Sequence, residues 1–162
     1  KMEDRYVFPI FDRENRLIGG AGRDITNRSK MKWKLVGEKK QWAYPLKYNR
    51  KYFALEKSAI LVESIGDMLA LWEAGIRNTI VSFGLFISSK IQQVLLALNL
   101  DKIYIAFNND TNQAGNEGAQ KARQKLLKHF DPEQIEIALP TKNDFGSMTK
   151  HEILEWKSQI KS

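Results

Sequence analysis

The alternation of apolar and polar residues changes its rhythm near residue 57. Before that point, residues 5–12 (RYVFPIFD) and 15–24 (NRLIGGAGRD) have the pattern of two strands joined by a polar turn at 13–15. Three glycines in the second stretch indicate a bulge or a close approach of another part of the backbone. The first third of the chain therefore begins as a small β-rich unit.

After that point, short and continuously apolar runs alternate with stretches of helical periodicity. The pattern predicts four strands and four helices, which are strands 59–64, 78–84, 102–107 and 134–140 and helices 66–75, 88–100, 114–130 and 149–160. Gly75 ends the first helix, Ser88 or Ser89 caps the second, and Thr149 caps the last.

Such alternation is typical of βαβ units around a sheet that is buried on both faces. We therefore expect an α/β fold with a central, mostly parallel four-stranded sheet flanked by helices, preceded by a small basic N-terminal subdomain that is α+β or β-rich. The expected domains are 1–57 and 58–162.

Composition narrows the possible functions. With 162 residues, of which 43% are hydrophobic, the chain can bury a substantial core. It has no apolar run of about 18 residues and no secretion leader, so we expect a cytoplasmic protein without a membrane partner. There are no cysteines, and the two histidines, His129 and His151, are too few and too far apart for a zinc site. Any metal ion must therefore be held by oxygen.

Positive charge is concentrated in the first third of the chain. Residues 1–57 contain 15 Lys or Arg and 7 Asp or Glu, whereas 58–162 contain 11 and 12. Residues 28–57 interleave ten basic residues with six aromatic ones, namely Trp33, Trp42, Tyr44, Tyr48, Tyr52 and Phe53. Cations neutralise phosphates and aromatic rings stack on unpaired bases, so this segment is either a groove for single-stranded nucleic acid or a solvated basic face.

Acidic and amide side chains follow three of the predicted strands. Glu63 ends the first strand and Asp67 begins the next helix; Asn108, Asn109 and Asp110 follow the third strand, and Asp144 follows the fourth. Ligands of open parallel sheets bind at the carboxyl ends of the strands. Carboxylates that lie close together repel one another unless a cation neutralises them. With oxygen ligands alone, the expected cation is Mg²⁺ or Mn²⁺.

Taken singly, these residues have simpler interpretations. Asp67 stands where a helix N-cap is expected, and Asp110 and Asp144 could be ordinary loop residues. Glu63, at a strand end beside Ser64 and Gly66, is the hardest to explain in this way.

The segments ILVESIGDMLALWEAGIRNTIVSFG and IAFNNDTNQAGNEGAQKA resemble the TOPRIM domain shared by DnaG-type primases, topoisomerases and some nucleases. On that resemblance Glu63 stands at the invariant Glu, Asp67 at the following acidic position, Asn108 and Asp110 at the Asp-x-Asp pair, and Asp144 at the late acidic position. Glu63, Asp67 and Asp110 would be catalytic, and all five residues would be metal ligands.

The resemblance extends upstream and narrows the family. RYVFPIFDRENRLIGGAGRDI and MKWKLVGEKKQWAYPL are similar to the segments that precede TOPRIM in bacterial and phage primases, and topoisomerases lack them. The resemblance implies that nucleotides or nucleic acid contact five basic residues, which are Arg23, Lys32, Lys34, Lys39 and Lys40.

The family implies a primase catalytic core that makes RNA primers by metal-dependent nucleotidyl transfer. Its cofactor would be Mg²⁺ or Mn²⁺, with no zinc in this chain. Its partners would be a single-stranded DNA template, ribonucleoside triphosphates, the RNA primer and a replicative helicase. Because the cysteine-rich zinc module of relatives is missing, we expect a fragment or a minimal protein with low activity of its own.

One departure from the family pattern keeps other functions open. Asn108 replaces the first carboxylate of the Asp-x-Asp pair, and an amide can ligate Mg²⁺ but adds no charge. The alternatives are a degenerate TOPRIM module that binds single-stranded nucleic acid without primase activity, and a TOPRIM nuclease.

Overall fold

The computed structural model describes residues 2–161. Its elements, in chain order, are β1 (Arg5–Phe11), β2 (Leu17–Asp24), β3 (Trp33–Gly37), η1 (Lys39–Gln41), α1 (Leu46–Glu56), β4 (Ser58–Val62), α2 (Ile65–Glu73), β5 (Thr79–Val81), α3 (Ser89–Ala97), β6 (Lys102–Ile105), α4 (Ala114–Leu126), η2 (Pro132–Gln134), β7 (Ile135–Ile137), η3 (Phe145–Ser147) and α5 (Lys150–Lys161).

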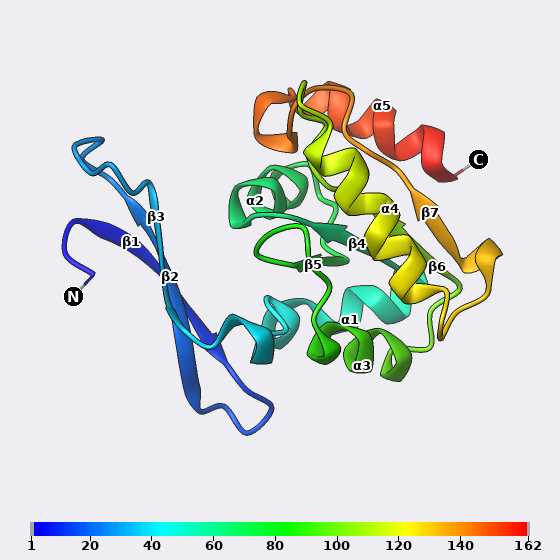
Figure 1. Ribbon diagram of the computed structural model, residues 1–162, viewed down its shortest axis with the longest axis horizontal. Helices are drawn as coiled ribbons and strands as arrows, with labels where there is room; N and C mark the ends of the chain where they lie inside the picture. The colour runs from blue at the N-terminus through cyan, green and yellow to red at the C-terminus, as the bar shows by residue number, and fades with distance from the viewer. Residues whose placement is uncertain (1, 162) are drawn as a thin grey trace.

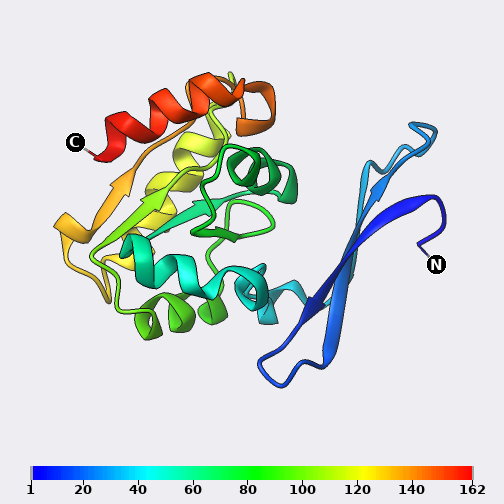
Figure 2. The same cartoon turned by 180° about the vertical axis from the view of Figure 1, so that it is seen from behind.

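The four strands predicted after residue 57 form one parallel sheet in the order β5-β4-β6-β7. The central strand β4 is buried throughout, and its alternate residues face two different cores. Ile60 and Val62 pack with α2 and α5, whereas Ala59 and Leu61 pack with α1, α3 and α4. Helices therefore cover both faces of the sheet, as Figures 1 and 2 show, and the predicted α/β class is confirmed.

Side-chain caps fix where the helices begin. The Ser64 hydroxyl accepts the N–H of Asp67 and caps α2, so the interpretation of Asp67 as the N-cap is wrong. The Ser88 hydroxyl accepts the N–H of Ile91 and caps α3. Thr149 accepts the N–H of Glu152, as expected for the cap of the last helix.

Several predicted elements are longer than the observed ones. β5 ends at Val81 because the next residues turn, with positive φ angles at Phe83 and Gly84. The helix predicted to reach residue 130 ends at Leu126, where the chain passes into a turn. These differences leave the strand order unchanged.

The first part of the chain forms a separate antiparallel sheet in the order β1-β2-β3. A register shift between Ile10 and Phe11 accounts for the predicted irregularity in the hairpin. β3 and α1 were not predicted. The sheet projects from the rest of the protein in Figure 1 and is joined to it through η1 and α1. The proposed boundary between residues 57 and 58 stays a prediction.

Trp42 packs between the small sheet and the main core. Its side chain is 1% exposed and lies edge-on to Phe83 with ring centroids 4.9 Å apart. The indole covers Gly19 of β2 so closely that a Cβ atom there would be 2.5 Å from a ring carbon. Glycine at this position lets the backbone of β2 approach the ring.

Among the helices of residues 2–161, none combines the length and the apolar composition that a membrane span requires.

We expect Gly19→Ala to destabilise the protein by about 1–3 kcal/mol, because the new methyl group overpacks the Trp42 contact. Gly20→Ala is the matched control, since its Cβ would meet its nearest neighbours at 3.7 Å, an ordinary contact. Urea unfolding of both variants measures the difference. Equal stability of the two variants would contradict this account of the contact.

Candidate functional site

A hydrogen bond joins the segments that directly follow β4 and β6. The half-buried carboxylate of Glu63, directly after β4, accepts the backbone N–H of Asn108 at 2.9 Å. Asn108 follows β6, which is the neighbour of β4 in the sheet. The parallel sheet thus brings Glu63 and the 108–110 loop together at one edge, as the sequence predicts.

Asp67 lies deeper, at 2% exposure, in the first turn of α2. One carboxylate oxygen accepts the N–H of Phe145 at 3.0 Å, and the other accepts the hydroxyl of Ser64 at 2.6 Å. Phe145 is itself fully buried and packs edge-on against Trp156. Asp67 therefore ties the loop that carries Asp144 to the start of α2.

The loop after β6 is held on two sides. The backbone N–H of Asn109 donates to the carbonyl of Asn143 at 2.8 Å, and its side-chain amide donates to the carbonyl of Pro140 at 3.1 Å. On the other side, a Cβ atom at Gly115 would lie 1.6 Å from the carbonyl oxygen of Asn108. Only glycine fits there, so α4 begins pressed against the loop.

Asp110 and Asp144 occupy different positions at this edge. The carboxylate of Asp110 is half-exposed and has no hydrogen-bond or ion-pair partner within residues 2–161, so it is available to a ligand. The carboxylate of Asp144 accepts the N–H of Ser147 at 2.7 Å and caps η3.

The gathered carboxylates affect one another. Burial raises the pKa of Glu63, the nearby charges of Asp67 and Asp110 raise it further, and the hydrogen bond from Asn108 acts in the opposite direction. Burial likewise raises the pKa of Asp67, with a smaller contribution from Asp144, against the hydrogen bonds from Ser64 and Phe145. A cation at this edge would relieve the repulsion.

The residues at this edge suit a hard cation that keeps part of its own water. Within residues 2–161, no three Asp, Glu, His or Cys side chains are grouped so that they alone could hold a metal ion. The side-chain oxygen of Asn108, however, is buried and has no hydrogen-bond partner in the described part of the chain. Mg²⁺ in nucleotide-dependent enzymes is commonly held by one or two carboxylates together with water and substrate phosphates. Glu63, Asp110 and the Asn108 oxygen fit that kind of site.

A hollow of about 230 Å³ lies beside Glu63, and its walls come from β3 and from residues that follow β4 and β5. Trp33 and Leu35 of β3 form one wall, and Ile65 and Phe83 form another. Aromatic and aliphatic walls next to a carboxylate can accommodate the flat face of a base.

Two of the five predicted basic residues reach the walls of this hollow. The guanidinium of Arg23 lies 5.8 Å from the ring centroid of Trp33, and the ammonium of Lys39 donates to the carbonyl of Phe83 at 3.2 Å. Lys40 is exposed on η1 and lines a second small hollow that also includes Phe83. Lys32 is exposed before β3, and Lys34 is half-buried within it.

Sequence reasoning missed several residues that build this edge. Ser64 and Phe145 hold Asp67, Gly115 admits the Asn108 carbonyl, and Phe83 shapes the hollow. A glycine in the first turn of a helix that directly follows a polar loop was a readable signal for Gly115. Phe145 lies 78 residues from Asp67 in the chain, so this contact left no local signal.

Comparison with known proteins agrees with this arrangement. A family profile described as the Toprim domain matches residues 57–136. A DNA primase from Legionella pneumophila is 30% identical over 94% of this chain. The chain contains a Toprim domain of the DnaG-primase type. It spans 28% of the length of that curated relative.

Solved structures extend the similarity beyond the Toprim domain. A DNA primase domain from Pseudomonas aeruginosa has 26% sequence identity and a TM-score of 0.79, covering 98% of this chain and 51% of that one. A DnaG primase catalytic domain bound to single-stranded DNA has a TM-score of 0.78 at 21% identity, covering 98% of this chain and 51% of that one. The small sheet and the Toprim domain thus occur together in primase cores, and the chain corresponds to such a core segment.

The raised pKa of Glu63 predicts a pH-dependent stability. The folded state holds the Glu63 proton more tightly than the unfolded state. The protonated carboxyl therefore stabilises the fold fully below its unfolded pKa of 4.5, and this contribution is lost as pH rises through the folded pKa. Glu63→Gln can still accept the Asn108 N–H but cannot ionise. We expect the stability of the variant, relative to the unchanged protein, to rise with pH above about 4.

Urea unfolding in EDTA across this pH range measures the difference. Glu73→Gln, at the exposed far end of α2, reports the effect of removing a carboxylate away from the edge. A stability difference for Glu63→Gln that stays constant with pH would contradict the assignment.

Proposed function

We propose that this chain is a catalytic segment of a primase that joins ribonucleotides into RNA primers on a single-stranded DNA template. The observation that carries the proposal is the pairing of Glu63 with the 108–110 loop at the sheet edge, beside a hollow with aromatic walls. The similarity to a primase catalytic domain bound to single-stranded DNA supports the choice of template.

In this proposal the acidic edge holds Mg²⁺ or Mn²⁺. Glu63, Asp110 and the side-chain oxygen of Asn108 would be direct ligands. Asp67 would support the site from within, since both of its oxygens already accept hydrogen bonds, and Asp144 would add charge beside it. When bound, the ions would neutralise charge on the triphosphate and orient the reacting groups.

The basic residues would hold phosphates around this edge. Arg23 and Lys39 border the hollow and would contact the nucleotide, while Lys32, Lys34 and Lys40 would follow the template or primer backbone. Trp33 would stack on a base at the wall of the hollow. Neither contact requires a particular base.

The reaction transfers a nucleotidyl group. The 3′-hydroxyl of the growing primer attacks the α-phosphate of the incoming ribonucleotide, a new phosphodiester bond forms and pyrophosphate leaves. Glu63 has a second proposed role, as the general base in place of a metal ligand. It would then accept the hydroxyl proton, because its raised pKa makes it a stronger base than an ordinary carboxylate. The replicative helicase would deliver the template.

A second function rests on Asn108. An amide at this position lowers the negative charge of the edge, which favours a Toprim module that binds single-stranded nucleic acid without making primers. A nuclease that uses the same edge is a third function. All three share the fold and differ in product.

Incubation with a single-stranded DNA template, ribonucleotides and Mg²⁺ or Mn²⁺ distinguishes these functions. We expect short RNA products that Glu63→Gln reduces by at least about a hundredfold, since it removes charge from the edge but keeps the hydrogen bond to Asn108. Asn108→Asp, which restores a carboxylate, should increase product.

Glu73→Gln is the matched control, since it makes the same change at an exposed acid away from the edge, and it should leave product formation unchanged. Salt-sensitive DNA binding without RNA product would favour the binding module, and cleaved template would favour the nuclease. Unimpaired primer synthesis by Glu63→Gln would remove Glu63 from the proposed site.

A further inference from the structure

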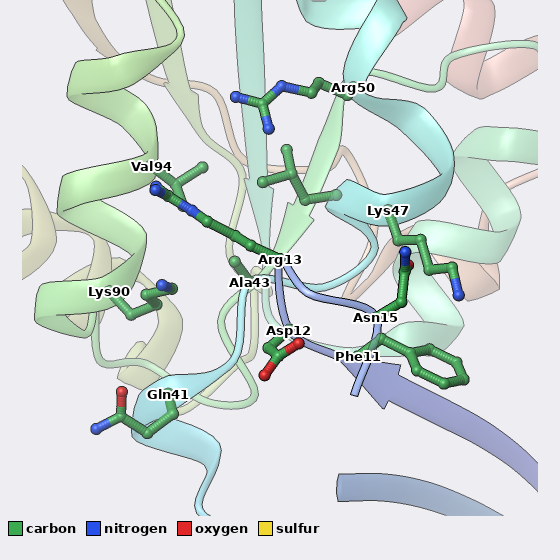
Figure 3. A pocket seen from close by; sticks show the side chains of 11 residues that line it. Phe11, Asp12, Arg13, Asn15, Gln41, Ala43, Lys47, Arg50, Lys90 and Val94 are labelled. Carbon is green, nitrogen blue, oxygen red and sulfur yellow. The ribbon is translucent and has the colours of Figure 1, made fainter. Parts of the chain in front are cut away.

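Another pocket, of about 330 Å³, opens where the turn between β1 and β2 meets the starts of α1 and α3 (Figure 3). It shares no lining residue with the hollow beside Glu63. Its volume lies at the lower end of the range for small-molecule sites.

Four cations line this pocket and come from three separate elements. Arg13 belongs to the turn, Lys47 and Arg50 to α1, and Lys90 to α3. Figure 3 shows the head groups of Arg13, Arg50 and Lys90 on the side of Val94, whereas Lys47 lies on the side of Phe11. The Lys47 ammonium is 3.7 Å from the centroid of the Phe11 ring, which fixes it at the wall.

The positive charge in this pocket is not neutralised by the protein. Within residues 2–161, the side chains of Arg13, Arg50 and Lys90 have no hydrogen-bond or ion-pair partner. Asp12 is the one acid that lines the pocket, and it is already engaged, since Arg16 binds one of its oxygens at 2.7 Å and two backbone N–H groups bind the other. Gathered cations of this kind repel one another unless an anion joins them.

The floor of the pocket is apolar, so it can contact an uncharged part of a bound anion. Phe11, Ala43, Leu46 and Val94 supply apolar surface, and Asn15 and Gln41 supply amides at its border. A solvated basic face has cations without such a floor. Guanidinium groups match the oxygens of phosphate in pairs, and an apolar floor matches a sugar or a base.

We propose that this pocket is a second phosphate-binding site, apart from the acidic edge, and that it takes a phosphorylated nucleoside. Arg13, Arg50 and Lys90 hold the phosphate, and the apolar floor holds the nucleoside. The nucleotide is either free or one unit of a strand. The site does not depend on primer synthesis at the sheet edge.

Binding in EDTA tests the proposal, because metal-dependent binding at the acidic edge is then suppressed. The probes are ATP and a ten-residue oligothymidylate, titrated by calorimetry against the unchanged protein and the double variant Arg50→Gln/Lys90→Gln. We expect the double variant to bind ATP at least about tenfold more weakly, since each charged hydrogen bond to phosphate contributes substantially.

The control variant Lys121→Gln/Lys128→Gln removes two exposed cations from α4 and the turn after it, and it should bind ATP as the unchanged protein does. Urea unfolding confirms that both variants are folded. If the double variant Arg50→Gln/Lys90→Gln binds only ATP more weakly, the ligand is a free nucleotide. If it binds only the oligonucleotide more weakly, the ligand is one unit of a strand. Unchanged binding of both probes, or equal losses in both variants, would overturn the site.

Discussion

Two carboxylates hold the acidic edge of the sheet together by accepting backbone N–H groups from loops far away in the chain. Glu63 binds the N–H of Asn108 across neighbouring strand ends, and Asp67 binds the N–H of Phe145 across to the loop before α5. Both carboxylates lose solvation when they are buried, and their pKa values rise as a result. The same burial that makes them costly to ionise fixes them in place, which is what a preorganised cation site needs.

The small antiparallel sheet matters because it supplies a wall for that edge. Trp42 joins the sheet to the main core, and β3 then presents Trp33 towards Glu63. Two cations of the first third border the hollow beside this edge, Arg23 through its contact with Trp33 and Lys39 through the Phe83 carbonyl. The positive charge of the first third therefore reaches the acidic edge at two residues, while other cations line the pocket at Arg13, Arg50 and Lys90.

Much of the Toprim domain was predictable because its signals are local. Solid apolar runs marked the buried parallel strands, and the acidic residues after them marked the edge. The sequence pattern does not predict β3, because three of its five residues are exposed and it pairs only with β2. α1 was not predicted because it buries only Asn49 and Phe53, and the Asn49 amide serves as a polar anchor by donating to two carbonyls near β5.

The acidic residues of the site could be predicted from the sequence, but the contacts that hold them in place could not. The sequence placed Glu63, Asp67 and Asp110 at strand ends, whereas the capping role of Ser64, the close approach at Gly115 and the free oxygen of Asn108 depend on tertiary packing. The pocket at Arg13, Arg50 and Lys90 depends on residues far apart in the chain, so no motif could reveal it.

The proposed site holds a divalent cation between Glu63, Asp110 and the side-chain oxygen of Asn108. Titration of ¹⁵N-labelled protein with Mn²⁺ tests it, because the paramagnetic ion broadens the amide signals of nearby residues. We expect selective broadening at residues 63–67 and 108–115, which is lost in Asp110→Asn and stronger in Asn108→Asp. Broadening that is centred elsewhere, or that Asp110→Asn does not change, would contradict it.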